Sequence, residues 1–259
     1  MPAHIYNWKP SAPDPRDLIF KPSFLTRLTK LPASADLSGR CSPVVDQGEL
    51  GSCTACAIVS GLREYLAING ASLPERLSRL YLYHEEREIE GTEGYDWGAD
   101  LKDGFDVLMR EGVPPESLWP YDVAQFTIDP PPEVNAAALP YRIKRYYRIY
   151  GIQAIKQCLV SGFPVVAGMD VFRQMEEDAG RTGIVTMPRL LDESLGGHAV
   201  TIVGYQDTPW NGNLPRWKGG GWLEVRNSWG YDWGKGGYFR VAYSYVTGGY
   251  MSEFWTARA

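Results

Sequence analysis

The chain has 259 residues, 44% hydrophobic and 22% charged, with a formal net charge of −5. This is the composition of a globular protein, and its acidity argues against nucleic acid or an anionic membrane surface as the main partner. No apolar run approaches the roughly 18 residues of a transmembrane helix.

The N-terminus lacks the basic region and apolar stretch of a secretory signal, so we expect a cytoplasmic protein or one exported without a classical signal peptide. The cysteines are too few for a disulfide framework, which favours a reducing compartment. They are Cys41, Cys53, Cys56 and Cys158.

Residues 1–30 are rich in proline and show no periodic element, so we expect an extended N-terminal arm. Its apolar side chains, including Tyr6 and Trp8, are costly to leave in water. We therefore expect at least part of the arm to lie on the body of the protein.

Three helices are predicted in the first half, over residues 53–68, 77–91 and 101–112. The second ends in an acidic stretch that begins at His84, and we expect this stretch and His84 to be exposed. The proline run 130–132 is the predicted border between a mainly helical lobe, 31–130, and a mainly β lobe, 131–259.

Apolar or alternating segments follow that border, each bounded by Gly, Pro or Asn. Helices first and strands afterwards predict an α+β fold in two lobes. The expected strands lie within 141–150, 163–171, 196–205, 221–230 and 237–244, with a short helix at 152–162.

Cys53 and Cys56 form a Cys-x-x-Cys pair, which occurs in redox sites and in zinc sites. The segment before the pair lacks the strand of a thioredoxin-like unit, and no second ligand pair completes a zinc site. Cys56 falls on the apolar face of the helix and is predicted to be a buried small hydrophobe.

Cys53 stands at the helix start, where free amides and the helix dipole favour a thiolate. A thiolate nucleophile needs an acid/base partner, and His198 is the best placed of the three histidines. Asn227 can orient the imidazole, and Gln47 can donate to an oxyanion together with the Cys53 amide.

The segments "DQGELGSC", "GGHAVTIVGY" and "NSWGYDWGKGGYFRV" resemble the papain-like cysteine peptidases, in the family's order. A fourth segment, "GADLKDGFDVLMREGVPPESLWPY", resembles the family's substrate-binding loop and the helix after it, and the likeness extends over residues 31–255. It implies a papain-like fold, a helical lobe and a β-barrel-like lobe with the active-site cleft between them.

The resemblance makes Cys53 the nucleophile, His198 its partner, Asn227 the orienting residue and Gln47 an oxyanion donor. It also implies a group of substrate-binding residues, with Ser252 near the floor of the S2 pocket and Trp229 over the His–Asn pair on the leaving-group side. The group is Gly98, Ala99, Gly197, Trp229 and Ser252.

The chain departs from the family at Leu50 and Thr54, which flank the nucleophile, and at Gly197, where Asp or Asn is frequent. The usual disulfide cysteines and the long propeptide are missing, which fits the bacterial branch. Residues 1–30 are extra, and we weigh two positions for them equally: a plug or small pro-region in the cleft, or a strap on the back of a lobe.

The predicted function is that of a cysteine endopeptidase that acts on polypeptides through a thioester, as a monomer with no cofactor or metal. Hydrophobic residues are expected at P2, where Glu253 would also admit a basic one. The alternatives are a catalytically silent binding or effector protein on the same scaffold, a Cys53–Cys56 redox protein, and an aminopeptidase or acyl transferase.

Overall fold

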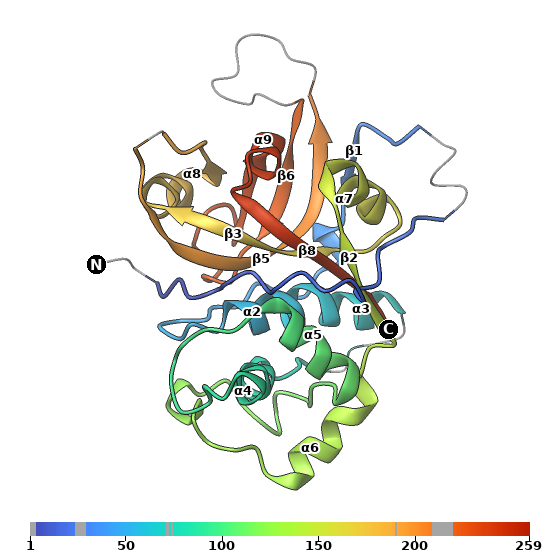
Figure 1. Cartoon of the computed structure of the whole chain (residues 1–259), viewed down its shortest axis with the longest axis vertical. Coiled ribbons are helices and arrows are strands. Elements are labelled where there is room, and N and C mark those ends of the chain that lie inside the picture. Colours follow the sequence, from blue (N-terminus) through green and yellow to red (C-terminus); the bar gives the residue numbers. More distant parts are fainter. Residues whose placement is uncertain (1–3, 24–29, 71–72, 74, 190, 209–219) are drawn as a thin grey trace.

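The computed structural model describes residues 4–23, 30–70, 73, 75–189, 191–208 and 220–259. Helices α2 to α6 gather in one half of the molecule, and the sheet with α7, α8 and α9 forms the other half (Figure 1). The predicted α+β class, with a helical half and a sheet half, is therefore confirmed. Within the described ranges no helix is both long and apolar enough to span a membrane.

The central helix runs without a break from Cys53 to Gly70, as α2 (Cys53–Ala55), a π-helical segment (Cys56–Arg63) and α3 (Glu64–Gly70). Every residue from 53 to 67 is buried, as expected for a helix that is covered on all sides. Gly61 permits this, because a Cβ there would lie 1.9 Å from the Thr201 hydroxyl of the sheet. The helix therefore sits directly against the strand that carries His198.

Helices α4 (Arg79–Glu90) and α5 (Leu101–Arg110) confirm the next two predicted helices. Ser78 and Asp100 cap their first turns, each accepting a hydrogen bond from a backbone amide three residues on. Gly91 ends α4 in the left-handed conformation, with φ of 68°. A shorter helix, α6 (Pro132–Ala138), begins inside the predicted proline border.

The expected exposure of His84 is wrong: the residue is only 3% exposed, and the stretch from Arg79 to Arg87 is buried. The loops after α4 cover its C-terminal half. Arg87 holds them, because its guanidinium donates to the carbonyls of Glu93, Tyr95 and Phe126. Residues 84–87 of the charged sequence are therefore internal, whereas residues 88–90 are exposed, so the predicted solvated end is confirmed only for the last three residues of the helix.

Among the described residues, eight strands form one sheet in the order β2-β8-β3-β5-β6-β7-β4, with β1 paired to β5. All pairs are antiparallel except β4 with β7. The five predicted strands are confirmed, whereas β1, β4, α8 and α9 had no clear pattern. The elements of this half are β1 (Ser34–Asp36), β2 (Arg145–Ile149), α7 (Gly151–Val160), β3 (Val165–Phe172), α8 (Gly180–Thr182), β4 (Ile184–Val185), β5 (Ser194–Asp207), β6 (Gly221–Arg226), β7 (Tyr238–Ala242), α9 (Tyr243–Thr247) and β8 (Met251–Arg258).

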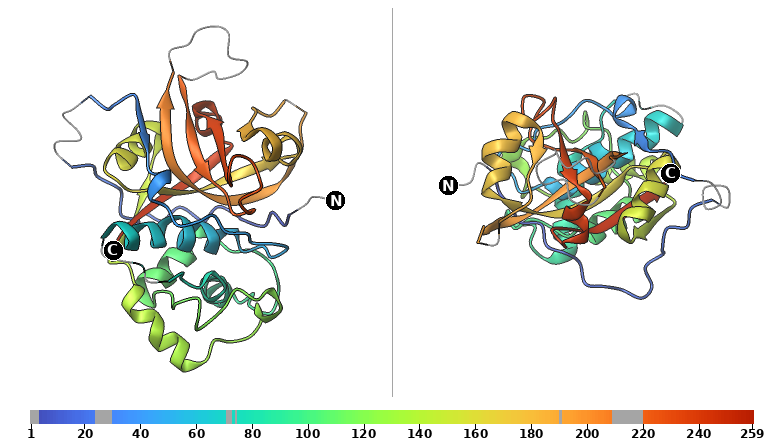
Figure 2. Two further views of the ribbon diagram at one scale, coloured as in Figure 1. Left: turned by 180° about the vertical axis from the view of Figure 1, so that it is seen from behind. Right: turned by 90° about the horizontal axis from the view of Figure 1, so that it is seen from above.

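The N-terminal arm runs between the helical half and the sheet, as both views along this boundary show (Figures 1 and 2). Asn7 forms a bridge with Gly197, and Ile19 forms one with Arg148 of β2. Tyr6, Trp8 and Phe20 are buried, so the prediction that part of the arm lies on the body is confirmed. Its residues 1–3 and 24–29 lie outside the described part of the chain.

Candidate active site

Cys53 is the first residue of the central helix, and its side chain is fully buried. Burial raises the pKa of the thiol to about 12, while the backbone amides of Ala199 and Thr54 face the sulfur and act in the opposite direction. Since Ala199 follows His198 on β5, the nucleophile candidate meets the strand that carries its predicted partner.

His198 and Asn227 form a hydrogen bond of 2.8 Å between Nε2 and Oδ1. The same Oδ1 accepts from the Ser228 amide at 2.9 Å, which fixes it as the oxygen of the Asn227 side chain. His198 Nε2 is therefore the protonated nitrogen of the neutral ring. Nδ1 carries the lone pair and has no hydrogen-bond partner, so this nitrogen is the one available to take a proton from a thiol.

The His–Asn pair is sealed from water by an aromatic cover. The indole of Trp229 stacks on the imidazole at 4.7 Å between ring centroids, and Trp233 packs against Trp229 at 4.9 Å. Burial lowers the pKa of His198 to about 4, although its bond to Asn227 acts against this shift. In this closed form, both the thiol and the imidazole favour their neutral states.

Gln47 is also fully buried, and both ends of its amide are held. Its Oε1 accepts from the Ser228 hydroxyl at 2.6 Å, and its Nε2 donates to the Leu50 carbonyl at 3.0 Å. A backbone bond from Gln47 to the Ser228 carbonyl joins this turn to the segment after Asn227. The turn before Cys53 is thereby fixed to the histidine side of the site.

Sequence reasoning missed two residues that support this geometry. Ser228 orients both Asn227 and Gln47, although it was visible in the "NSWG" segment. Glu86 is completely buried and accepts a hydrogen bond from Thr54, the residue after Cys53. Burial raises the pKa of Glu86 well above its usual value, and nothing in the charged sequence around it signalled an internal position.

Two of the predicted substrate-binding residues, Gly98 and Gly197, contact Asn7 and Trp8 of the arm. The Trp8 amide donates to the Gly197 carbonyl at 3.0 Å, and a Cβ on Gly98 would lie 2.6 Å from the Cβ of Asn7. Ala99, next to Gly98, is buried. Ser252 pairs with Gly168, and the Trp8 indole lies so close to Gly168 that a Cβ there would be 1.9 Å from it.

The arm also covers the predicted catalytic groups. His4 stacks on Trp229 with 4.4 Å between centroids and 8° between planes, and Tyr6 meets His198 edge-on at 6.3 Å. The Tyr6 hydroxyl donates to Glu176 at 2.5 Å. Further on, the Ser11 amide donates to Glu253 of β8 at 2.9 Å.

Two groups of side chains among the described residues have the proximity needed to hold a metal ion. Neither includes Cys53, His198 or Asn227, and both belong to the helical half. The chemistry available where the arm crosses is therefore that of a thiol, an imidazole, an orienting amide and a second amide beside the helix start.

Residues 31–255 match the family described as papain family cysteine protease. The chain is 36% identical over 224 residues to an uncharacterized peptidase C1-like protein of Acanthamoeba polyphaga mimivirus, covering 82% of this chain and 68% of that one. It is 28% identical over 219 residues to a viral cathepsin of Spodoptera litura multicapsid nucleopolyhedrovirus, of which it spans 58%.

Among solved structures, the chain is similar to xylellain, a cysteine protease from Xylella fastidiosa. The TM-score is 0.88 at 32% identity, and the match covers 98% of this chain and 96% of that one. A digestive procathepsin L 3 of Tenebrio molitor shares the fold with a TM-score of 0.69 at 20% identity, over 94% of this chain and 75% of that one.

Proposed function

The chain belongs to the papain family of cysteine proteases, and on this premise we propose that it is an endopeptidase with Cys53 as nucleophile and His198 as acid and base. The observation that carries the proposal is the His198–Asn227 hydrogen bond, which leaves Nδ1 of His198 without a hydrogen-bond partner. The next residue on the same strand, Ala199, faces the Cys53 sulfur through its backbone amide. Gln47 and Asn227 complete the site.

The reaction follows from these positions. Cys53 transfers its proton to His198 Nδ1, and the thiolate attacks the carbonyl carbon of the scissile peptide bond. The Cys53 amide and the Gln47 side chain donate to the oxyanion. His198 then gives its proton to the leaving amine, a thioester forms, and a water deprotonated by His198 hydrolyses it to the free acid.

We further propose that the arm inhibits this site, so that the chain is a zymogen. Support comes from the contacts of His4, Tyr6 and Trp8 with the aromatic cover, His198 and Gly197. The proposed substrate-binding residues, Gly98, Ala99, Gly197, Trp229 and Ser252, would become accessible to a polypeptide once the arm leaves.

The arm runs in a direction that protects it from cleavage. It passes from Trp229, on the proposed leaving-group side, to Glu253, next to Ser252 on the proposed acyl side. A substrate would run the opposite way, with its N-terminal part near Ser252 and its leaving group near Trp229. The arm therefore presents its peptide bonds to Cys53 with reversed polarity.

The division into an arm (1–30), a helical lobe (31–130) and a β lobe (131–259) belongs to the proposal, with the exceptions that β1 pairs with the sheet and α6 lies in the helical half. A monomeric state, a polypeptide substrate and a place in the bacterial branch also belong to it. A redox role for Cys53 and Cys56 is the weaker alternative. Cys56 is buried with its sulfur 3.8 Å from both the Ser52 hydroxyl and the Arg79 guanidinium, and both cysteines are free.

Labelling with the epoxide inhibitor E-64 and mass mapping tests the proposal on the wild-type chain and on Cys53→Ala, each with and without residues 1–30. Labelling at Cys53, faster without the arm, is the expected result. A folded, arm-free chain that neither labels nor cleaves peptides would favour a silent scaffold. Loss of function in Cys56→Ser with a reversible Cys53–Cys56 disulfide would favour the redox alternative.

A further inference from the structure

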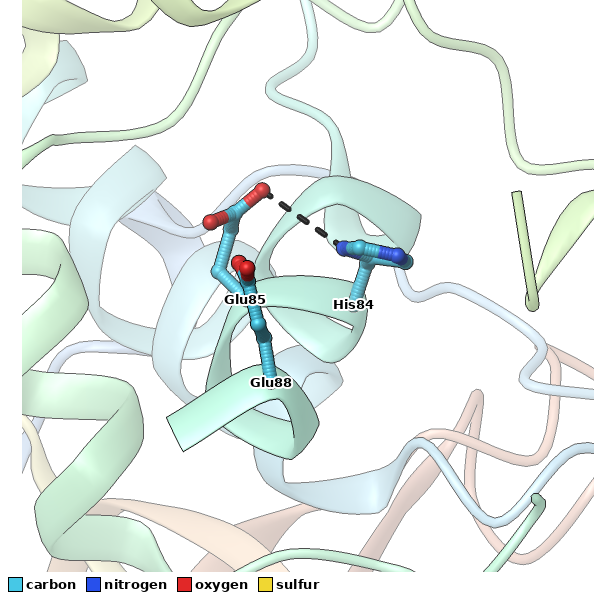
Figure 3. A group of neighbouring side chains, drawn as sticks. All are labelled: His84, Glu85 and Glu88. Atoms are coloured by element: carbon cyan, nitrogen blue, oxygen red, sulfur yellow. Dashed lines mark ion pairs between the residues drawn. The ribbon is translucent and has the colours of Figure 1, made fainter. Parts of the chain in front are cut away.

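Helix α4 carries a histidine and two glutamates whose ligand atoms lie close together. One nitrogen of His84 and one carboxylate oxygen each of Glu85 and Glu88 all fall within 4.8 Å of one another. His84 and Glu88 are one turn apart, so they share a face of the helix. Figure 3 shows both carboxylates turned to the side of the imidazole.

His84 is buried without a hydrogen bond. Its side chain is 3% exposed, and neither ring nitrogen makes a hydrogen bond. Carboxylate oxygens are near but not aligned for one: Glu85 Oε1 lies 3.6 Å from Nδ1, and Asp129 Oδ1 lies 3.2 Å from Nε2. A buried polar group without a partner is costly, so the site is incomplete as it stands.

The surrounding charge is negative. The carboxylate oxygens of Glu85 and Glu88 lie within 4.8 Å of each other, and Glu111 is a further carboxylate beside Glu85. A cation among these groups would reduce the repulsion between the carboxylates and would give the imidazole Nδ1, which makes no hydrogen bond, a direct ligand bond.

We propose that His84 Nδ1, Glu85 and Glu88 bind a divalent transition-metal ion such as Zn²⁺. One imidazole nitrogen with two carboxylates is a donor set that suits zinc better than calcium or magnesium, which prefer oxygen alone. Asp129 would accept from Nε2–H and fix the ring, which is the usual arrangement behind a histidine ligand.

The bound ion would stabilise the helical lobe. Asp129 belongs to the loop between Phe126 and α6, so a metal held by α4 would join this loop to the helix through His84. All four cysteines lie within the described residues and are free, so no disulfide already provides such a cross-link. The inference is independent of the proposed peptidase activity, because the site includes none of the catalytic residues.

Glu90, Asp100 and Asp103 form the other group and provide a matched control. Its oxygens already accept from backbone amides: Glu90 from Asp100, and Asp100 from Asp103. It also has no histidine. It therefore lacks the unpartnered buried donor that singles out the group at His84.

Zinc titration by calorimetry, with thermal unfolding, tests the proposal on the full-length Cys53→Ala chain, which lacks the competing thiol of the active site. We expect one Zn²⁺ per chain and a rise in Tm of several degrees at saturation. Adding His84→Ala should abolish both effects, and Glu88→Gln should weaken binding at least about tenfold. Asp103→Asn and His198→Ala should bind as the parent does.

No binding up to about 1 mM free Zn²⁺ would overturn the proposal. Binding retained in folded His84→Ala, or equal binding of Mg²⁺ and Zn²⁺, would also overturn it, because either result means that the imidazole is not a ligand. If His84→Ala fails to fold, the exposed Glu88→Gln variant decides: unchanged zinc affinity there rejects the site.

Discussion

The two halves of the N-terminal arm attach to the body in different ways. Residues 4–11 bury aromatic rings against His198, Trp229 and Gly197, with Tyr6 8% and Trp8 6% exposed. Residues 14–20 lie over α5 and β2, where Lys102 pairs with Asp14 and Asp17 and the backbone pairs with Arg148. Leu18 and Ile19 there remain about half exposed, at 48% and 54%.

This difference indicates that the two halves of the arm have separate roles, one blocking access to Cys53 and the other holding the arm on the body. Buried apolar area is the larger source of free energy, and charge pairs near the surface contribute little. We therefore expect residues 4–11 to control access to Cys53 and residues 14–20 mainly to keep the arm in place. The following experiments compare the two halves.

Deletion of residues 1–12 should have the largest effect, because it removes every described contact of the arm with Trp229, His198 and Gly197. The rate of E-64 labelling at Cys53 should rise by about a thousandfold, the size expected when roughly 4 kcal/mol of contact is lost. Equal rates with and without the segment would mean that it does not block the thiol.

Trp8→Ala should raise the labelling rate by about a hundredfold, since the indole is buried against Gly168 and Gly197 and its loss costs several kcal/mol. Stopped-flow measurement with a fluorescent epoxide would follow this change. Tyr150→Ala, at an aromatic side chain that is 62% exposed, is the control and should label as the wild type does.

The ratio of labelling rates between the full-length and arm-deleted chains should depend on pH. Burial under the arm lowers the pKa of His198 to about 4 from its ordinary 6.5, so between these values the open form binds more protons and acid favours opening. The closed form is fully favoured above pH 6.5, and the ratio should rise up to about tenfold per pH unit below it.

Other groups modify this profile, and His4 of the arm, whose pKa is also lowered by burial, acts in the same direction as His198. The pKa of Cys53 is raised to about 12 from 9.0, so alkaline solution above pH 9 should also open the arm. The pKa of Glu253 is raised by burial, which makes its closed form retain a proton in acid and reduces the acid effect. A ratio that stays constant from pH 7 to pH 5 would contradict the assignment of His198 as a buried neutral imidazole.

Ser11→Ala removes the hydroxyl bond to Glu253 but leaves the amide bond in place. We expect about a fivefold increase in labelling, the effect of one hydrogen bond to a carboxylate that keeps its other donors. Glu253 still accepts from the Trp255 indole at 3.1 Å. A larger effect than that of Trp8→Ala would show that the polar contact, and not the indole, holds the blocking half.

Asp14→Asn should have the smallest effect, under about threefold, because its partner Arg16 is exposed and its other partner, Lys102, keeps its ion pair with Asp17. Labelling in dilute buffer and in 0.5 M NaCl, where the Debye length is only about 4 Å, would measure any residual electrostatic contribution. A large increase here would mean that the tethering half also controls access to the thiol.

The predictable parts of the molecule are those in which local sequence and tertiary position agree. Cys53 follows a Gly-Ser turn at a helix start, and His198 lies on an apolar strand, so both could be found from residue order alone. The predicted helices 77–91 and 101–112 have capping residues at their starts and a glycine at their ends, so both ends can be predicted from the sequence. The α+β class followed from these elements.

The unpredicted parts depend on tertiary contacts. His84 and Glu86 belong to a charged run whose pattern indicates solvent, and they are buried because Arg87 binds loops that are distant in sequence. The arm has no periodicity, so its path depends on the glycines of the cleft, which no pattern within residues 1–30 reveals. The role of Gly168 depends on a tertiary contact, because the Trp8 ring packs so closely against it that no side chain would fit there.

Under the proposed inhibition, the covalent link between the arm and the site that it covers would change the kinetics of activation. A separate inhibitor dissociates on dilution, but a segment joined to its target by a short chain keeps an effective concentration in the millimolar range at any protein level. Activation of this protein should thus be insensitive to expression level. The same contacts supplied as a free peptide of residues 4–17 would have to bind from bulk solution, where they would inhibit only at high concentration.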